Sequence, residues 1–202
     1  MIQDPKKISG QTSGSHEKIT VAISGTADDS FLKQEDLSEV VKIGVEVARQ
    51  GAALISGATT GIPIWAAKGC KEAGGLSIGI SPALSKQEHL EKWKLPTDFM
   101  DVIMYVGGGY AYRDVVMVRS ADALAIGPGR IGTIHEFTTA FEDNKPIGVL
   151  TGPWDTDDEI KEILTKSHRA GDNKKIIYDA DPSKLVKRLI ELVKVDRKGL
   201  SN

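Results

Sequence analysis

One turn of the sequence combines the residue types that bind a phosphate. It reads Gly127-Pro128-Gly129-Arg130-Ile131-Gly132-Thr133 and joins a short apolar run to a segment of helical period. Glycines let backbone N–H groups approach an oxygen-rich ligand, and a helix N-terminus adds partial positive charge. Charge-assisted hydrogen bonds contribute roughly 1.5 to 3 kcal/mol each, more than the helix dipole alone. We expect a phosphate to bind here, the alternative being an ordinary tight turn.

Arg113 and Glu136 are candidates for chemistry beside that phosphate. Glu136 completes the pattern Thr133-x-x-Glu136, which taken alone is most simply a capping box. A carboxylate in the first turn of a phosphate-binding helix would also face the ligand, near an attached sugar. Arg113 either reaches the same crevice or pairs with Asp114 on a solvated face. The four histidines lack ligand spacing and are interpreted as surface or capping residues, so no metal site is predicted.

These residues need a scaffold that brings separate turns together. From Ile19 onward, short apolar runs alternate with segments of helical period, which is typical of βαβ units around a buried parallel sheet. The pattern predicts one α/β domain over 19–196, a three-layer Rossmann-like fold with an open, mostly parallel sheet of about seven strands and helices on both faces. The predicted strands are 19–24, 53–56, 76–80, 102–106, 123–126, 147–150 and 175–178.

Four glycine-rich turns follow predicted strands. In open parallel sheets, ligands bind in the crevice beyond the carboxyl ends of the strands, so these turns are the candidate ligand-binding segments. None is a GxGxxG after the first strand, which disfavours a dinucleotide site. The candidate residues are Gly25, Thr26, Gly57, Thr60, Gly108, Gly109, Gly129, Arg130, Ile131, Gly132 and Thr133.

Several helix boundaries and irregular segments can also be predicted. A helix is expected over 34–50, a capping box at 156–159 opens a helix to about residue 169, and Asp181 with Pro182 begins the last helix. The segment 82–98 is predicted as a loop with a short helix. Residues 1–18 are expected to form a disordered N-terminal arm and 197–202 a C-terminal tail.

Composition excludes several partner classes. The net charge of −2 and the aromatic share of 5% disfavour nucleic acid, and no apolar stretch is long enough to cross a membrane. Cys70 is the only cysteine, so no internal disulfide forms, which fits a cytoplasmic location; a buried, inert thiol is favoured over a nucleophile.

Spaced motifs resemble the LOG (Lonely Guy) family, once mislabelled "possible lysine decarboxylase". The resemblance covers about 19–150 and departs at Asp114, where the family has lysine, and at Arg130, where it has the second glycine of PGG. The matching residues are Arg113, Arg119, Ser120-Ala121-Asp122, Pro128-Gly129-x-x-Gly132-Thr133-x-x-Glu136 and Lys145-Pro146.

The resemblance implies a homodimer or higher homo-oligomer that hydrolyses the N-glycosidic bond of a nucleoside 5′-monophosphate without a cofactor. The turn 129–133 would bind the phosphate, and Arg113 and Glu136 would be the catalytic pair. The two departures motivate an alternative, a non-catalytic carrier of a nucleotide or of the molybdenum cofactor, a pterin phosphate. A third reading, an assembly role, rests on Trp65, Trp93 and 82–98.

Overall fold

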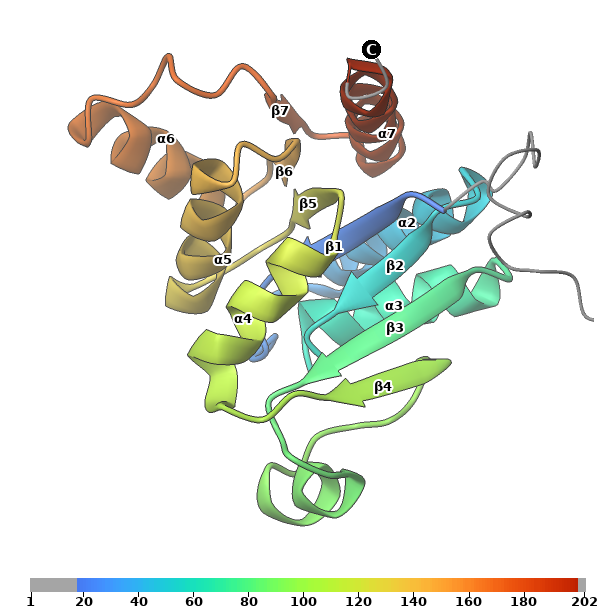
Figure 1. Cartoon of the computed structure of the whole chain (residues 1–202). Coiled ribbons are helices and arrows are strands. Elements are labelled where there is room, and N and C mark those ends of the chain that lie inside the picture. Colours follow the sequence, from blue (N-terminus) through green and yellow to red (C-terminus); the bar gives the residue numbers. More distant parts are fainter. Residues whose placement is uncertain (1–17, 200–202) are drawn as a thin grey trace, which may run out of the picture.

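The scaffold is one open parallel sheet (Figure 1). The structure is a computed structural model that describes residues 18–199. The strands are β1 (Thr20–Ser24), β2 (Ala53–Ser56), β3 (Leu76–Ser81), β4 (Val102–Tyr105), β5 (Ala123–Ile126), β6 (Ile147–Leu150) and β7 (Ile176–Asp179). All seven are parallel, in the order β4-β3-β2-β1-β5-β6-β7. The predicted fold class is confirmed, and each strand boundary lies within one residue of its predicted position.

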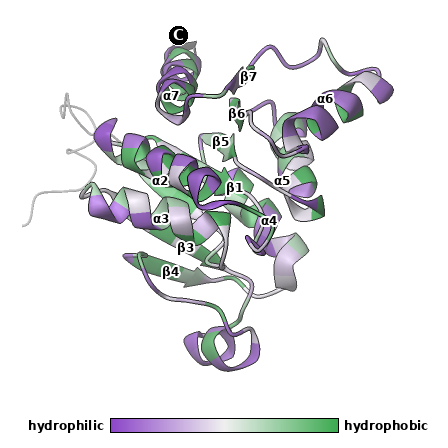
Figure 2. Ribbon diagram, turned by 180° about the vertical axis from the view of Figure 1, so that it is seen from behind, coloured by the Kyte–Doolittle hydropathy of each residue, from purple (hydrophilic) through white to green (hydrophobic). Residues whose placement is uncertain are grey.

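Short apolar runs form the central strands because helices cover both faces of the sheet. Every residue of β2, β5 and β6 is buried, as parallel strands between two helical layers require. Helices α2 (Gln34–Arg49), α3 (Ile62–Glu72) and α7 (Pro182–Gly199) cover one face, and α4 (Gly109–Ser120), α5 (Ile131–Glu142) and α6 (Thr156–Lys166) cover the other. Seen from behind, the strands are mostly hydrophobic, and hydrophilic residues gather on the outer sides of α2 and α3 (Figure 2).

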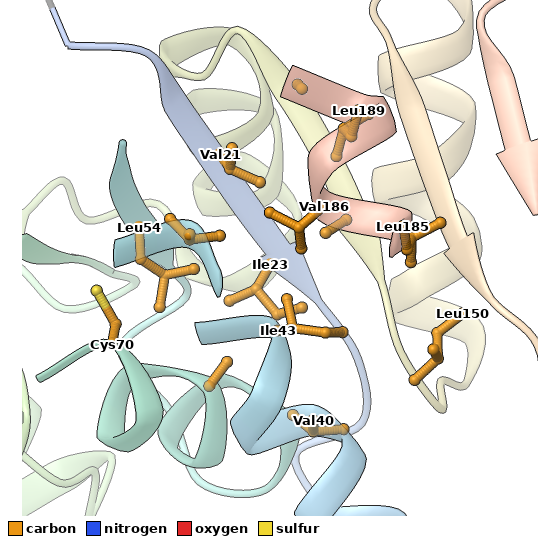
Figure 3. Close-up of a cluster of buried hydrophobic side chains, with 14 of the residues drawn as sticks. Val21, Ile23, Val40, Ile43, Leu54, Cys70, Leu150, Leu185, Val186 and Leu189 are labelled. Carbon is orange, nitrogen blue, oxygen red and sulfur yellow. The ribbon is translucent and has the colours of Figure 1, made fainter. Parts of the chain in front are cut away.

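The larger core lies between the sheet and α2, α3 and α7. Figure 3 shows Val21 and Ile23 of β1 pointing toward Ile43 of α2 and Val186 of α7. Cys70 belongs to this cluster and is buried, which raises the pKa of its thiol, as expected of an inert cysteine.

Helices α2 and α3 approach so closely that only glycine fits at their contact. A Cβ on Gly44 would lie 1.9 Å from the Ala66 carbonyl oxygen, and one on Gly69 would lie 2.1 Å from the carbonyl oxygen of Val41. The close packing holds α3 in position against α2.

Some predicted boundaries are corrected. Residues 197–199 continue α7, so the predicted tail is shorter, and α6 ends at Lys166. The Thr156 hydroxyl accepts a hydrogen bond from Gly129 N–H at 2.8 Å instead of capping its own helix.

Other local predictions are confirmed. Asp181 caps α7 as predicted, since its Oδ1 accepts a hydrogen bond from Ser183 N–H at 2.9 Å. The segment 82–98 is a loop around a short π-helical turn, η1 (Glu88–Lys92), also as predicted. The predicted arm, except for residue 18, and residues 200–202 lie outside the described residues.

Candidate functional site

The order of the strands places a crevice between β1 and β5. The chain runs outward from β1 through β2 and β3 to β4, returns through α4, and continues from β5 on the other side of β1. At such a reversal the connections leave the sheet in opposite directions, which opens a crevice at the carboxyl ends of the two central strands. A cavity of about 320 Å³ lies there. Its lining residues are Ile23, Gly25, Thr26, Ala27, Asp28, Gly57, Thr59, Pro63, Tyr110, Arg113, Asp114, Arg130, Gly132, Thr133 and Glu136.

Many of the residues predicted from sequence gather around this cavity. The ones that line it are Gly25, Thr26, Gly57, Arg113, Arg130, Gly132, Thr133 and Glu136. Five do not. Thr60 donates its hydroxyl hydrogen bond to the Ala27 carbonyl, Ile131 is 85% exposed, and the Gly129 amide is bonded to Thr156. Gly108 and Gly109 have positive φ where α4 begins, so they shape the turn.

Two of the lining glycines make room for protein side chains. A Cβ on Gly57 would lie 1.4 Å from an Arg113 terminal nitrogen, and a Cβ on Gly25 would lie 2.4 Å from Ile62. Because Gly57 has no side chain, the Arg113 guanidinium can lie against the backbone at residue 57, on the wall of the cavity.

Arg113 is buried with a donor that has no acceptor. Its side chain is 7% exposed, and its Nε lies 2.9 Å from Asp114 Oδ1. The N–H does not point at that oxygen, so within residues 18–199 this Nε has no hydrogen-bond partner. The guanidinium also lies 5.5 Å from the centre of the Tyr110 ring. Because Arg113 lines the cavity, its guanidinium places a buried positive charge beside a bound ligand.

Glu136 does not cap its helix. The helix begins at Ile131, so Thr133 lies inside the first turn and Glu136 in the second, and the capping interpretation is wrong. The Glu136 carboxyl instead accepts a hydrogen bond from the Ser24 hydroxyl at the end of β1. Burial raises the pKa of Glu136 to about 8; Arg113 opposes the rise, the Asp114 carboxyl adds to it, and Ser24 opposes it. Glu136 is therefore mostly protonated at neutral pH.

Asp114 and His135 complete the group around Glu136. Asp114 is 5% exposed, and its Oδ2 lies 3.0 Å from Nδ1 of His135, whose side chain is 41% exposed. The sequence interpretation missed both, treating Asp114 as a lost lysine and His135 as a surface residue. The sequence did contain one signal for them, because Asp114 directly follows Arg113 and His135 directly precedes Glu136.

Two exposed, oppositely charged side chains meet at the cavity. Arg130 lies 3.0 Å from Asp28 and 5.8 Å from the centre of the Phe31 ring. Hydrogen bonds from Ser30 lower the pKa of Asp28, and Arg130 lowers it further. Arg130 therefore points across the cavity toward the β1 loop, and Asp28 is a lining residue that the sequence interpretation did not select.

The first turn of α5 supplies donors for an anion. Within residues 18–199, the N–H groups of Gly132 and Thr133 have no hydrogen-bond acceptor, as is usual at a helix N-terminus. Both residues line the cavity that holds Arg113. Amide donors and the positive end of the helix favour a negatively charged group at this position.

The two tryptophans make contacts within the chain. Trp65 Nε1–H donates to Asp29 at 2.8 Å, and the Trp93 ring packs edge-on against Tyr110, with the ring centres 5.0 Å apart. Trp93 thereby connects the 82–98 loop to the cavity wall. In the described residues, no group of His, Cys, Asp and Glu side chains is arranged to hold a metal ion, and no helix is long and apolar enough to span a membrane.

A doubly wound sheet with a ligand crevice at its reversal point defines the Rossmann-like class of α/β proteins. Within that class, the chain belongs to the SLOG cluster4 family, whose model matches residues 18–186. The resemblance is thus confirmed for the SLOG/LOG-like superfamily, and the narrower LOG assignment stays a prediction. A curated relative, an uncharacterised protein of Archaeoglobus fulgidus, is 35% identical over 112 residues, which are 55% of this chain and 68% of the relative.

Solved structures share the fold. The molybdenum cofactor binding protein of Rippkaea orientalis has a TM-score of 0.70 and 24% identity, covering 90% of this chain and 98% of that one. The molybdenum cofactor carrier protein of Chlamydomonas reinhardtii has a TM-score of 0.69 and 24% identity, covering 88% and 99%. DNA processing protein A of Helicobacter pylori, described as binding single-stranded DNA, has a TM-score of 0.59 and 18% identity, covering 86% and 80%. At these identities the likeness concerns the fold alone.

Proposed function

We propose that the chain hydrolyses the N-glycosidic bond of a nucleoside 5′-monophosphate, releasing the free base and ribose 5-phosphate. The observation that carries the proposal is the position of Arg113, a buried guanidinium in the same cavity as the Glu136 carboxyl, whose pKa is raised to about 8. A buried cation favours an oxygen-rich, negatively charged ligand, and a buried acid beside it can act on a leaving group.

The phosphate would bind at the start of α5. The N–H groups of Gly132 and Thr133 donate to its oxygens, and Arg130 adds a cation when it turns from Asp28 toward the ligand. The cavity of about 320 Å³ is near the lower end of the roughly 300 to 1,000 Å³ typical of ligand pockets. It suits a compact ligand such as a mononucleotide.

Glu136 would act as the acid. As the C1′–N bond breaks, its electron pair leaves with the base, and the base nitrogen takes the Glu136 proton. The carboxylate that remains stabilises the cationic sugar, because a negative charge in a buried site interacts strongly with the oxocarbenium-like state. Water then adds to C1′ and returns a proton to the site, so the base gains one proton and the water loses one.

A second candidate is a carrier that binds a nucleotide or pterin phosphate without cleaving it. Two departures from the LOG pattern favour it, because Asp114 stands where that family has lysine and Arg130 where it has glycine. The related folds include proteins named for binding or carrying molybdenum cofactor. The phosphate of such a ligand would use the same amides of α5. The bulk of a pterin with its metal would extend beyond a cavity of this size.

The remaining expectations belong to the same proposal. We infer a cytoplasmic homodimer or higher homo-oligomer that requires neither cofactor nor metal and binds a nucleotide-like small molecule rather than nucleic acid or membrane. Light scattering of the purified chain measures its mass in solution. Binding of a fluorescent single-stranded oligonucleotide tests the exclusion of DNA.

The test of the hydrolase proposal is product release from a panel of nucleoside monophosphates. Free base and ribose 5-phosphate should appear in equal amounts, and Glu136→Gln should reduce the rate at least about 100-fold. Glu46→Gln, a buried carboxyl outside the cavity, should retain the wild-type rate. Calorimetry on the same nucleotides separates the two candidates, since saturable binding without any product supports the carrier.

A further inference from the structure

A second buried carboxyl lies in the cavity and has no role in the scheme above. The Asp114 side chain is 6% exposed and contacts Arg113 through Oδ1 at 2.9 Å and His135 through Oδ2 at 3.0 Å. It lines the same cavity as Glu136 and is close enough to raise the pKa of that carboxyl. The cavity therefore contains two interacting carboxyl groups contributed by two helices, α4 and α5.

The surroundings of the two carboxyls differ in charge. Asp114 contacts both the Arg113 guanidinium and the His135 imidazole, whereas Glu136 accepts its hydrogen bond from the neutral Ser24 hydroxyl and interacts with Arg113 only through its charge. Two neighbouring carboxyls in a buried site resist carrying two negative charges, and together they tend to hold one proton. The remaining ionisable groups of the cavity are Tyr110, beside Arg113, and the Arg130–Asp28 pair.

His135 connects this pair of carboxyls with solvent. Its ring is 41% exposed while its Nδ1 contacts the buried Asp114. When a ligand fills the cavity, His135 offers Asp114 a route for protons to and from solvent. The contact also fixes the orientation of the Asp114 carboxylate.

We propose that Asp114 is the catalytic base of an acid–base pair with Glu136, and that His135 is the residue that positions Asp114. The inference rests on the proposed hydrolysis. Glu136 gives its proton to the leaving nitrogen while the electron pair of the C1′–N bond departs with the base. The attacking water bonds to C1′ through its oxygen and gives a proton to Asp114. Transfer of that proton from Asp114 to Glu136 restores the pair, so no oxidant, reductant or net proton is needed.

Substitutions at Asp114 test whether this residue acts as a base or merely replaces the lysine found at this position in the LOG family. Asp114→Asn keeps the shape and removes the base, so kcat should fall about 100-fold or more with little change in KM. Asp114→Lys, which introduces the family residue, should be equally inactive. Turnover equal to or above wild type in either variant would overturn the proposal. Asp157→Asn, a buried aspartate paired with Lys161 outside the cavity, is the control and should retain activity.

The positioning role of His135 has its own readout. His135→Asn keeps a donor near the position of Nδ1 and should retain most of the rate, whereas His135→Ala should lose about 10-fold and displace the pH profile. Equal rates and unchanged pH profiles in the two variants would contradict a positioning role.

Carbon-13 NMR titration of the Glu136 carboxyl needs no substrate. Removal of the Asp114 charge should lower the pKa of Glu136, so the titration should move to lower pH in Asp114→Asn. If the Glu136 titration is the same in Asp114→Asn as in the wild type, the two carboxyls do not interact, and the proposed acid–base pair is overturned even if the enzyme is active. If the wild-type chain cleaves no nucleotide, the proposed function fails, and the titration still decides whether the two carboxyls are coupled.

Discussion

The protonated state of Glu136 makes the stability of the protein depend on pH in a way that one substitution should remove. Its pKa is about 8 in the folded chain and 4.5 for an unperturbed glutamate. Between those values the folded state binds more protons at this position than the unfolded state, so the free energy of unfolding falls as pH rises. The loss begins near pH 4.5 and levels off above pH 8.

The size of the effect follows from the two pKa values. From pH 6 to pH 9 the wild-type chain should lose about 3 kcal/mol through this group. For a domain of this length, that corresponds to a fall of roughly 6 to 12 °C in the unfolding midpoint. Glu136→Gln keeps a neutral side chain of the same shape that still accepts from Ser24, so it should lack this contribution.

The assay is urea unfolding of the wild type and Glu136→Gln at several values between pH 6 and pH 9. The difference in stability should grow by about 3 kcal/mol in favour of the variant as the pH rises. Glu46→Gln, which alters a buried carboxyl outside the cavity, should retain the wild-type slope. Parallel curves for the wild type and Glu136→Gln would refute a raised pKa and, with it, the acid assigned to the mechanism.

Four further substitutions test the geometry. Gly57→Ala places a methyl 1.4 Å from an Arg113 nitrogen, so hydrolysis and nucleotide binding should fall at least about 10-fold, measured by product release and calorimetry. Gly44→Ala places a methyl 1.9 Å from a carbonyl oxygen of α3 and should destabilise the chain by about 1 to 3 kcal/mol or more in urea unfolding. Asp28→Asn releases Arg130 for the phosphate and should lower KM several-fold, whereas Arg130→Gln should raise KM about 10-fold, both with kcat nearly unchanged.

These variants have a common control in Gly171→Ala, whose added methyl meets no atom within 4 Å and should change neither activity nor stability. Unchanged binding in Gly57→Ala would contradict the placement of Arg113. A stable Gly44→Ala would mean that α2 and α3 separate easily, and a higher KM in Asp28→Asn would show that the ion pair assists binding.

The scaffold is largely predictable because it depends on local pattern. Runs such as 53–55 and 123–126 are short and wholly apolar, which is typical of strands buried on both faces. The Asp181 cap and the helix over 34–49 follow equally local rules. The position of the crevice between β1 and β5 follows from the order of the strands in the sheet. That order depends on the whole fold, and the sequence pattern does not specify it.

The chemistry of the site is less predictable because it depends on contacts between distant segments. The pattern Thr133-x-x-Glu136 fits both a capping box and a catalytic carboxyl. Only the position at which α5 begins, Ile131, decides between these two interpretations. The donor to Glu136 is Ser24, 112 residues away. The sequence pattern predicts that Gly57 lets the backbone approach a ligand, whereas in the structure its lack of a side chain makes room for Arg113.

A crystal structure of Glu136→Gln with a nucleoside 5′-monophosphate tests the proposed hydrolysis most directly. We expect an intact nucleotide whose phosphate accepts hydrogen bonds from the amides of Gly132 and Thr133, with an oxygen on Arg113 and the C1′–N bond beside residue 136. A nucleotide bound with its phosphate away from α5, or with C1′ out of reach of residue 136, would contradict it.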